Sequence, residues 1–271
     1  MTPRHHTTTQ QTGHGSSGPR GLAGAADLPD AAKPRPDWVP ETAFGRWFLS
    51  TTIWRDYVLN PAVQQLAMLA GARFPREAHL LDLGCGAAAS IPLLVKTFRP
   101  DHITALDIDP AALETARRKH GAASDALGVR TTFTQASATR LPLSDASIDA
   151  VFCHQLLHHL YRQRAALREI RRVLRPGGLL MLAESCRPFI ETLPVRLLFR
   201  HPKGVQREAT DYARAVSQAG LSVQEDDVLT TRPWWSTYDL GVTERVVSLH
   251  DYRPIKARPT ELLLVAQRPP K

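Results

Sequence analysis

The chain has 271 residues, of which 43% are hydrophobic and 22% are charged, and its formal net charge at pH 7 is +8. This length allows one or two domains with a substantial apolar core, and no apolar run reaches the roughly 18 residues that cross a membrane. The amino terminus lacks the apolar segment of a secretory signal. The sequence therefore predicts a cytoplasmic protein with no membrane partner.

Residues 1–37 are rich in His, Thr, Gln, Gly, Ser and Pro and contain few large apolar side chains. Such a segment buries too little apolar surface to offset the conformational entropy lost on folding. We therefore expect a disordered tail, in which His5, His6 and His14 are solvated rather than bound to a metal.

Three tryptophans, Trp38, Trp47 and Trp54, lie in residues 38–75. Tryptophan offers a large apolar surface with one hydrogen-bond donor, which suits the wall of a pocket for a flat or apolar small molecule. We interpret this segment as an N-terminal helical lid. Packing of an N-terminal helix against the rest of the protein explains the tryptophans equally well.

Five apolar runs alternate with helical patterns along the rest of the chain. The runs occupy residues 79–83, 103–106, 148–152, 179–183 and 261–266. Continuous apolar runs are typical of parallel strands that are buried on both faces. The alternation predicts an α/β fold with a mostly parallel, doubly wound sheet and helices on both faces.

The helices between these runs have recognisable ends. Apolar residues at 91, 94, 95 and 98 recur at helical spacing directly after the first run. Asp109 and Pro110 supply a cap and a first-turn proline for a second helix, which we expect to reach about Lys119. Further helices are expected around residues 167–174, before Pro176-Gly177-Gly178, and around residues 212–219, ended by Gly220.

The first strand ends in a glycine turn. Residues 79–86 read His-Leu-Leu-Asp-Leu-Gly-Cys-Gly, and 21 positions after Gly86 the second apolar run ends at Asp107. Glycines at a strand end permit a sharp turn and a close approach of ligand to backbone. A carboxylate at the tip of the neighbouring strand can accept hydrogen bonds from both hydroxyls of a ribose. The spacing therefore predicts a site for an adenosine-type ligand.

The details of the turn leave two ligand classes open. Gly84, Gly86 and Ala89 fit the Gly-x-Gly-x-x-Ala variant of a dinucleotide fingerprint, so this pattern alone permits NAD. Asp82 favours another ligand, because a carboxylate facing the turn repels a pyrophosphate and suits an ammonium or sulfonium. We therefore expect a cationic nucleoside.

Five motifs in this order over about 100 residues carry a family resemblance. They are His79 to Gly86, Ala105 to Asp109, Leu141-Pro142-Leu143 with Ile148 to Val151, His158-His159-Leu160, and Arg172 to Gly178. Together they resemble class I S-adenosylmethionine-dependent methyltransferases over roughly residues 60–268, and within this family they are most like methyltransferase types 11 and 25. The resemblance implies a Rossmann-like, seven-stranded sheet with an antiparallel last strand, and a methyltransferase domain over residues 76–271.

The resemblance also implies roles for individual residues toward the cofactor S-adenosylmethionine. Gly84, Cys85 and Gly86 would pass under its methionine part with Asp82 close by, and Asp107 would hold the ribose. Ile108, Ser137 and Ala138 would lie by the adenine.

Where many members have an Asp that accepts from the adenine amino group, this chain has Ser137. An uncharged hydroxyl makes a weaker hydrogen bond than a carboxylate, so we expect adenine recognition to depend more on backbone groups. We interpret Asp109 as a helix cap.

Three histidines are candidates for catalysis. His154 follows the strand at residues 148–152, where it would contact the cofactor or act as general base. His158 and His159 stand in a Leu-His-His-Leu context, where capping or packing of a helix start is the structural alternative. The ordinary pKa of histidine, near 6.5, allows each to accept a proton at neutral pH. A hydroxyl acceptor needs such a base, whereas an amine does not.

Other residue types carry less information. Cys85, Cys153 and Cys186 have no Cys-x-x-Cys or Cys/His spacing, so we expect reduced thiols and no metal. The arginines between residues 162 and 175 fall largely on the polar side of one predicted helix. We interpret them as a solvated helix face rather than an RNA groove.

The resemblance thus implies methyl transfer to an O, N or C atom of a small-molecule acceptor, and we expect a role in specialised metabolism and a monomer or homodimer. The residues 185–207 and the segment containing Trp234 and Trp235 would complete the cover over the acceptor. The basic charge favours RNA or protein methylation as an alternative, but no Asn-Pro-Pro-Tyr motif is present. A cofactor-binding cyclase or scaffold without methyl transfer is a third reading.

Overall fold

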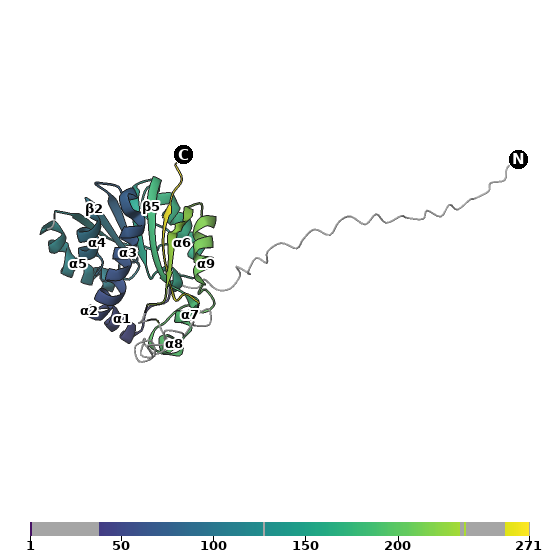
Figure 1. Cartoon of the computed structure of the whole chain (residues 1–271), viewed down its shortest axis with the longest axis horizontal. Helices are drawn as coiled ribbons and strands as arrows, with labels where there is room; N and C mark the ends of the chain where they lie inside the picture. Colours follow the sequence, from purple (N-terminus) through teal and green to yellow (C-terminus); the bar gives the residue numbers. More distant parts are fainter. Residues whose placement is uncertain (2–37, 127, 234–235, 237–257, 271) are drawn as a thin grey trace, which may run out of the picture. The chain divides into compact units, whose positions relative to one another are not determined.

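Seven strands form one sheet in the computed structural model of the chain (Figure 1). The structure describes residues 1, 38–126, 128–233, 236 and 258–270. The strands are β1 (His79–Leu83), β2 (His102–Asp107), β3 (Arg130–Gln135), β4 (Ile148–His154), β5 (Leu174–Ser185), β6 (Ser222–Thr231) and β7 (Glu261–Gln267). Their order is β3-β2-β1-β4-β5-β7-β6, and only β7 runs antiparallel to its neighbours. The predicted sheet is confirmed. The predicted tail, Trp234 and Trp235 lie outside the described residues.

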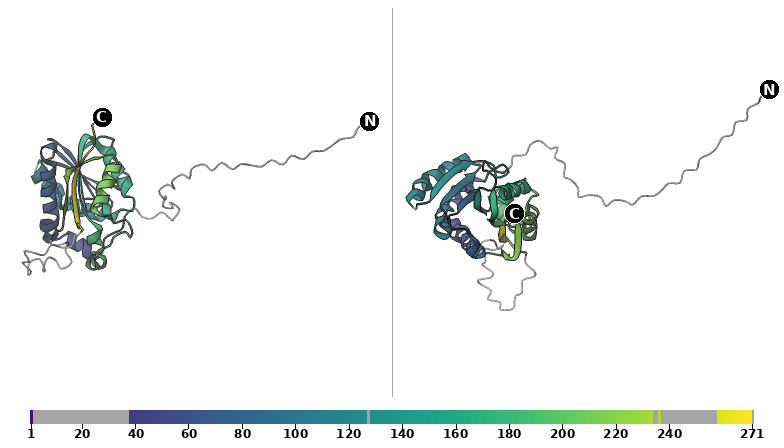
Figure 2. Two further views of the ribbon diagram at one scale, coloured as in Figure 1. Left: turned by 45° about the vertical axis from the view of Figure 1, so that its right-hand side comes forward. Right: turned by 90° about the horizontal axis from the view of Figure 1, so that it is seen from above.

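Helices cover both faces of this sheet. They are α1 (Ala43–Leu49), α2 (Thr52–Trp54), the π-helix η1 (Arg55–Leu59), α3 (Asn60–Ala70), the 3-10 helix η2 (Gly71–Arg73), α4 (Ile91–Phe98), α5 (Pro110–Ala126), the 3-10 helix η3 (Leu157–His159), α6 (Gln163–Val173), α7 (Arg187–Ile190), α8 (Leu193–Leu198) and α9 (Ala209–Gln218). Figure 2 shows the dark blue helices on one side of the sheet and the green helices on the other. The four helices predicted after β1 are present, and α5 continues beyond Lys119 to Ala126.

The continuous apolar runs are explained by burial on both faces. Leu80 packs in a cluster with α3, α4 and α5, whereas the next residue, Leu81, packs in a cluster with α6 and α9. Both leucines are fully buried. Because side chains alternate along a strand, a strand between two helical layers needs apolar residues at every position.

The N-terminal helices have two different positions. Val63 and Leu66 of α3 are fully buried in one cluster with Leu263 and Val265 of β7, so α3 belongs to the layer on the sheet. The second part of the segment predicted as a lid, residues 38–75, thus contains a helix of the core, α3. Only the residues before α3 remain candidates for a lid.

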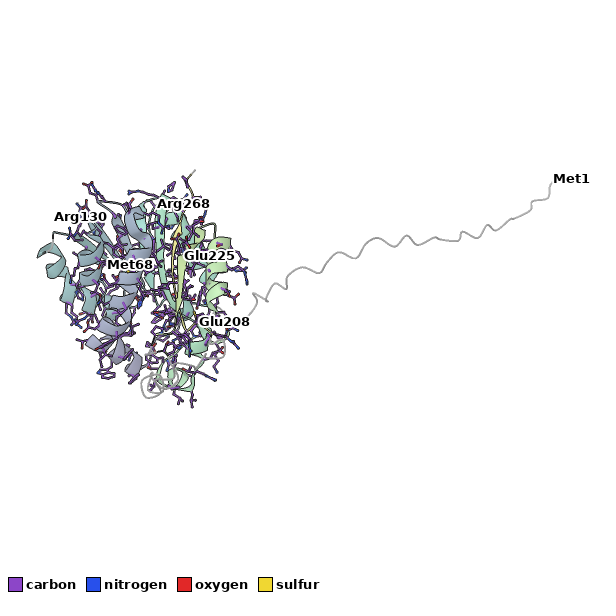
Figure 3. The ribbon with its side chains drawn as sticks, viewed as in Figure 1. Met1, Met68, Arg130, Glu208, Glu225 and Arg268 are labelled. Atoms are coloured by element: carbon purple, nitrogen blue, oxygen red, sulfur yellow. The ribbon has the colours of Figure 1, made fainter. Side chains whose placement is uncertain are left out.

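The ligand end of the sheet can be located from the strand directions. Arg130 begins β3 and Arg268 follows the antiparallel β7, so both mark the amino ends of the parallel strands. Figure 3 shows them at the end of the sheet away from Glu208. The carboxyl ends therefore point toward α1, α2, α7 and α8 (Figure 1). No helix within the described ranges combines the length and apolar character needed to cross a bilayer.

Candidate active site

The turn after β1 depends on its two glycines. Gly84 and Gly86 have φ angles of 78° and 52°. A Cβ atom on Gly84 would lie 2.9 Å from Cδ1 of Leu156, whereas nothing lies within 4 Å of a Cβ on Gly86. The backbone amides of Gly84 and Cys85 donate to the carbonyl of Leu106 at 2.8 and 3.1 Å. Gly84 therefore permits tight packing, and Gly86 leaves open space beside the turn.

Asp107 ends β2 and faces this turn. Its Oδ2 accepts a hydrogen bond from the Gly86 amide at 2.8 Å, and its Oδ1 accepts one from the Asp109 amide at 2.9 Å. Burial raises the pKa of this carboxyl, while the two amide hydrogen bonds lower it. Each oxygen has two lone pairs, so each can accept one further hydrogen bond. The geometry suits two neighbouring hydroxyls of a ribose.

Asp82 lies in β1 with 2% of its surface exposed. The Ser90 hydroxyl donates to its Oδ2 at 2.5 Å. Burial raises the pKa of Asp82 to about 7, against the smaller opposing effect of Ser90. The carboxyl is therefore only partly ionised at neutral pH, and a cation bound beside the turn would favour its charged form.

Cys85 stands between the two glycines. It is buried and has no disulfide partner, and Cys153 and Cys186 are free and buried as well. Burial raises the pKa of the Cys85 thiol, so it stays protonated at neutral pH. A protonated thiol is a poor nucleophile, which agrees with a small space-filling residue in the turn.

His154 ends β4, the strand next to β1. Its ring lies 5.7 Å from Trp54 edge to face, and 6.0 Å from Phe152, centroid to centroid. The Nε2 atom is buried without a hydrogen-bond partner in the described part of the chain. Burial lowers the pKa of His154 to about 3, so the ring is neutral at pH 7. A buried polar atom without a partner is one that a ligand can satisfy.

The segment after β3 borders the same space. The Ser137 Oγ accepts a hydrogen bond from the Thr139 amide at 3.2 Å, and the Ala136 amide donates to the Asp107 carbonyl at 3.0 Å. Ile108, Ser137 and Ala138 line the cavity described below. The Ser137 hydroxyl is therefore engaged within its own loop.

His158 is held by a buried carboxylate that the sequence analysis missed. Glu184, near the end of β5, is fully buried, and its Oε2 lies 2.6 Å from Nδ1 of His158. Its Oε1 accepts from the amides of Leu156 and Leu157 at 2.9 and 2.6 Å. The sequence contained a signal for Glu184, because this residue directly follows the apolar run 179–183. It therefore lies at the same edge of the sheet as Asp82 and Asp107.

His159 and His201 adjoin His158, and His201 was likewise absent from the predicted site. The ring centroids of His158 and His159 are 4.3 Å apart, and that of His201 lies 5.2 and 4.8 Å from them. Burial lowers the pKa of His201 to about 3 and that of His159 well below its ordinary value. Both rings are therefore neutral at pH 7.

One cavity of about 1100 Å³ joins the glycine turn to the histidines. Its lining includes every residue predicted for the cofactor or for catalysis: Asp82, Gly84, Cys85, Gly86, Asp107, Ile108, Ser137, Ala138, His154, His158 and His159. Trp38 and Trp54 also line it, whereas Trp47 does not and is 60% exposed. The structure thus brings the predicted residues together around one space.

Two segments distant in sequence meet over this cavity. The Phe199 ring contacts Phe44 and Phe48 edge to face, with centroids 5.6 and 5.7 Å apart. The Thr42 hydroxyl donates to the Leu198 carbonyl at 2.6 Å, and the Arg200 amide donates to Glu41 at 2.8 Å. All three phenylalanines also line the cavity. The aromatic residues therefore both form its wall and pack the two segments together.

Similarity to known proteins agrees with this site. The family profile described as "Methyltransferase domain" matches residues 81–182. The chain is 30% identical to 27-O-demethylrifamycin SV methyltransferase of Amycolatopsis mediterranei over 198 residues, which are 66% of this chain and 68% of the other. It is 33% identical to an O-methyltransferase of Aspergillus sclerotiorum over 51% of this chain and 54% of the other. The crystal structure of the [4+2]-cyclase SpnF superposes with a TM-score of 0.55 at 22% identity, covering 77% and 81% of the two chains.

These similarities, together with the sheet and the glycine turn, define the class. The chain belongs to the class I S-adenosylmethionine-dependent methyltransferase family. It spans about half the length of the Aspergillus and Penicillium O-methyltransferases that it matches. The similarity to the cyclase concerns the fold alone.

Proposed function

We propose that this protein transfers a methyl group from S-adenosylmethionine to an oxygen atom of a small-molecule acceptor. The observation that carries the proposal is the single cavity that joins the glycine turn and Asp107 to an aromatic chamber with histidines on its wall. Relatives named as O-methyltransferases, including one that acts on 27-O-demethylrifamycin SV, support oxygen as the acceptor atom.

The residues around the turn fit the cofactor. Gly86 leaves room for its methionine part, Asp107 has lone pairs for the ribose hydroxyls, and Asp82 suits a nearby positive charge. Ile108, Ser137 and Ala138 would border the adenine, and Nε2 of His154 would receive a hydrogen bond from the ligand. When bound, the cofactor supplies a methyl group that the positive sulfur has already activated.

The remaining space suits an apolar acceptor. A cavity of about 1100 Å³ is slightly larger than the roughly 300–1,000 Å³ of ordinary ligand pockets, so it has room for a cofactor and an acceptor together. The walls on the acceptor side are formed by Phe44, Phe48 and Phe199. Such walls exclude water and orient the acceptor oxygen toward the methyl carbon, about 3 Å away and opposite the sulfur.

An oxygen acceptor must also lose its proton. The acceptor oxygen would form a bond to the methyl carbon while the carbon–sulfur bond breaks, and the hydroxyl proton would leave. His154 is too weakly basic for this task, because burial lowers its pKa to about 3. Burial lowers the pKa of His159 and His201 as well, so neither is assigned as the base. In our proposal the cluster of His158, His159 and His201 faces and orients the acceptor hydroxyl, and Glu184 positions His158.

The experiment is a mass-spectrometric screen for products that gain one methyl group. Phenols, alcohols and carboxylic acids would be incubated with the protein and S-adenosylmethionine, alongside amines and carbon acids as controls. We expect methylation of an oxygen acceptor, and loss of it in Asp107→Ala. Methylation confined to amines, to carbon or to RNA would contradict the proposal. Cyclisation of a substrate without a gain in mass would favour the cyclase reading instead.

We further infer a cytoplasmic location, which the composition and the three free cysteines support, and a monomer or homodimer.

A further inference from the structure

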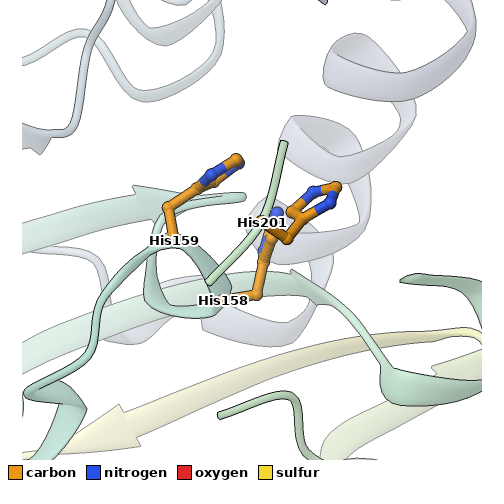
Figure 4. A group of neighbouring side chains, drawn as sticks. All are labelled: His158, His159 and His201. Carbon is orange, nitrogen blue, oxygen red and sulfur yellow. The ribbon is translucent and has the colours of Figure 1, made fainter. Parts of the chain in front are cut away.

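Three histidine side chains converge on the acceptor side of the cavity. His158 and His159 belong to η3, and His201 belongs to a separate segment that passes beside them after α8 (Figure 4). One ring nitrogen from each side chain can be chosen so that all three lie within 4.8 Å of one another. All three residues line the cavity.

His158 is oriented by its buried partner. Because the Glu184 carboxylate accepts a hydrogen bond from Nδ1 at 2.6 Å, Nε2 is the ring nitrogen that remains to bind a metal ion. Glu184 is itself fixed by the amides of Leu156 and Leu157. A histidine that donates its other N–H to a carboxylate is the arrangement that orients metal-binding histidines in proteins.

His159 and His201 are available to the same ligand. Neither ring has a hydrogen-bond partner within the part of the chain that the structure describes, and their centroids are 4.8 Å apart in a stacked contact. His201 is only partly buried, so its ring can rotate toward the other two. The cluster thus offers three ring nitrogens that lie within 4.8 Å of one another on the cavity wall.

We propose that His158, His159 and His201 bind one divalent transition-metal ion, with an open coordination position facing the cavity. Zinc–nitrogen bonds of about 2.1 Å in a tetrahedral site place the donor atoms about 3.4 Å apart, so a modest rotation of two rings closes the site. Three imidazoles suit zinc, cobalt, nickel or ferrous iron and disfavour magnesium and calcium, which prefer oxygen. Three protein ligands with an open position are typical of catalytic rather than structural zinc.

The role of this ion deepens the proposed function and depends on it. The acceptor hydroxyl would take the open position, where the ion lowers its pKa and the O–H bond breaks with release of the proton to solvent. The oxygen then carries the electron pair that forms the bond to the methyl carbon. The ion binds and polarises, and it is neither oxidised nor reduced.

Metal binding can be tested on the full chain without any acceptor or methyl donor. Protein stripped with a chelator would be titrated with Zn²⁺ and Co²⁺, with the bound metal counted by elemental analysis. We expect one ion per chain and the visible absorption of tetrahedral Co²⁺. His201→Ala and His159→Ala should each weaken binding by at least about tenfold, and Glu184→Gln by about 10- to 100-fold.

Two matched controls address the other histidines. His102→Ala removes a ring that stacks on His79 at 4.1 Å, away from the cavity, and it should keep the ion. A chain with His5, His6 and His14 all changed to Ala should keep it as well. An ion lost in either control but kept in His201→Ala overturns the proposal, as does a wild-type chain that binds no ion.

A ligand swap guards against a folding defect. His201→Cys keeps a donor at this position, and we expect it to bind Co²⁺ with a thiolate-to-metal absorption band that the wild type lacks. If this variant is folded, judged by its cofactor affinity, and shows no such band, the proposal fails.

The outcomes also separate this inference from the proposed function. Metal bound without methylation of any oxygen acceptor would overturn the function and leave the metal site intact. Unchanged methylation by stripped protein would overturn the metal's role in the reaction.

Discussion

At the scale of single residues, Asp107 is the strongest test of the cofactor site. Its two oxygens each accept one amide hydrogen bond and can each accept a ribose hydroxyl, so Asp107→Ala should weaken S-adenosylmethionine binding by at least about tenfold. Isothermal titration calorimetry measures this directly. Asp101→Ala, at an exposed carboxylate just before β2, should leave the affinity unchanged. Equal affinities in the wild type and Asp107→Ala would remove the ribose assignment.

Asp82 makes a prediction about pH. Burial raises its folded-state pKa to about 7 from an ordinary value of 3.8, so its contribution to stability is complete below about pH 4 and is lost as pH rises through 7. Asp82→Asn has no charge to bury, and its side-chain oxygen can still accept from Ser90. We therefore expect the melting temperature of Asp82→Asn minus that of the wild type to be larger at pH 8 than at pH 4. A difference between the two proteins that does not change with pH would contradict the assignment.

The residues that the sequence predicted and those that it missed differ in a physical way. Gly84, Gly86 and Asp107 lie in short motifs whose spacing is set by one strand and its successor. His201 comes from a segment far along the chain, and only packing of that segment against η3 brings it to the site. Local patterns predict local geometry, whereas a site assembled from distant segments depends on tertiary contacts.

At the scale of elements, the same distinction separates the strands. The apolar runs predicted the inner strands, but β3 and β6 have no such run because they are the two edges of the sheet. Their side chains are mostly partly or fully exposed, so polar residues are tolerated. The resemblance to a family, rather than periodicity, supplied the count of seven.

The turn between β1 and α4 should be intolerant of a side chain at Gly84. Its φ angle of 78° strains any other residue, and a Cβ would meet Leu156 at 2.9 Å. We expect Gly84→Ala to lower the free energy of unfolding by about 1–3 kcal/mol, measured by chemical denaturation. Gly121→Ala, within α5 and with open space around the added methyl, should not destabilise the protein. Equal stability of Gly84→Ala and the wild type would show that the turn differs from the structure.

The contact between α1 and the segment after α8 should control the acceptor rather than the cofactor. Phe199 lines the cavity and packs on Phe44 and Phe48, so Phe199→Ala removes both wall and contact. Once an acceptor has been identified, we expect Phe199→Ala to have a higher KM for it than the wild type and a nearly unchanged affinity for the cofactor. Leu197→Ala, at a neighbouring side chain that is 72% exposed and outside the cavity lining, is the control. An effect confined to cofactor binding would contradict the lid assignment.

At the scale of the whole molecule, the chain has a net charge of +8, but the basic side chains of the residues that the structure describes do not gather at the cavity. The described residues that line the cavity include two basic side chains, Arg46 and Lys119, and four carboxyl groups: Glu41, Asp82, Asp107 and Asp109. Part of the basic charge near α6 is paired, since Arg172 donates to Asp145 and Glu169 at 2.7 and 2.8 Å. The electrostatic footprint expected around an RNA-modifying site is therefore absent from this part of the structure.

This distribution predicts weak, non-specific contact with RNA. Binding that rests on scattered surface arginines falls steeply with salt, because each phosphate contact releases a counterion. Gel-shift assays with single-stranded and hairpin RNA should show no complex at physiological salt, and added RNA should not inhibit methylation of the small acceptor. Arg164 and Arg168 project from α6, so charge reversal of both should change only binding at low salt. A stable complex at physiological salt, accompanied by methylated RNA, would contradict this prediction and require the acceptor chamber to admit a nucleotide. The aromatic wall formed by Phe44, Phe48 and Phe199 would then be a stacking surface for a base.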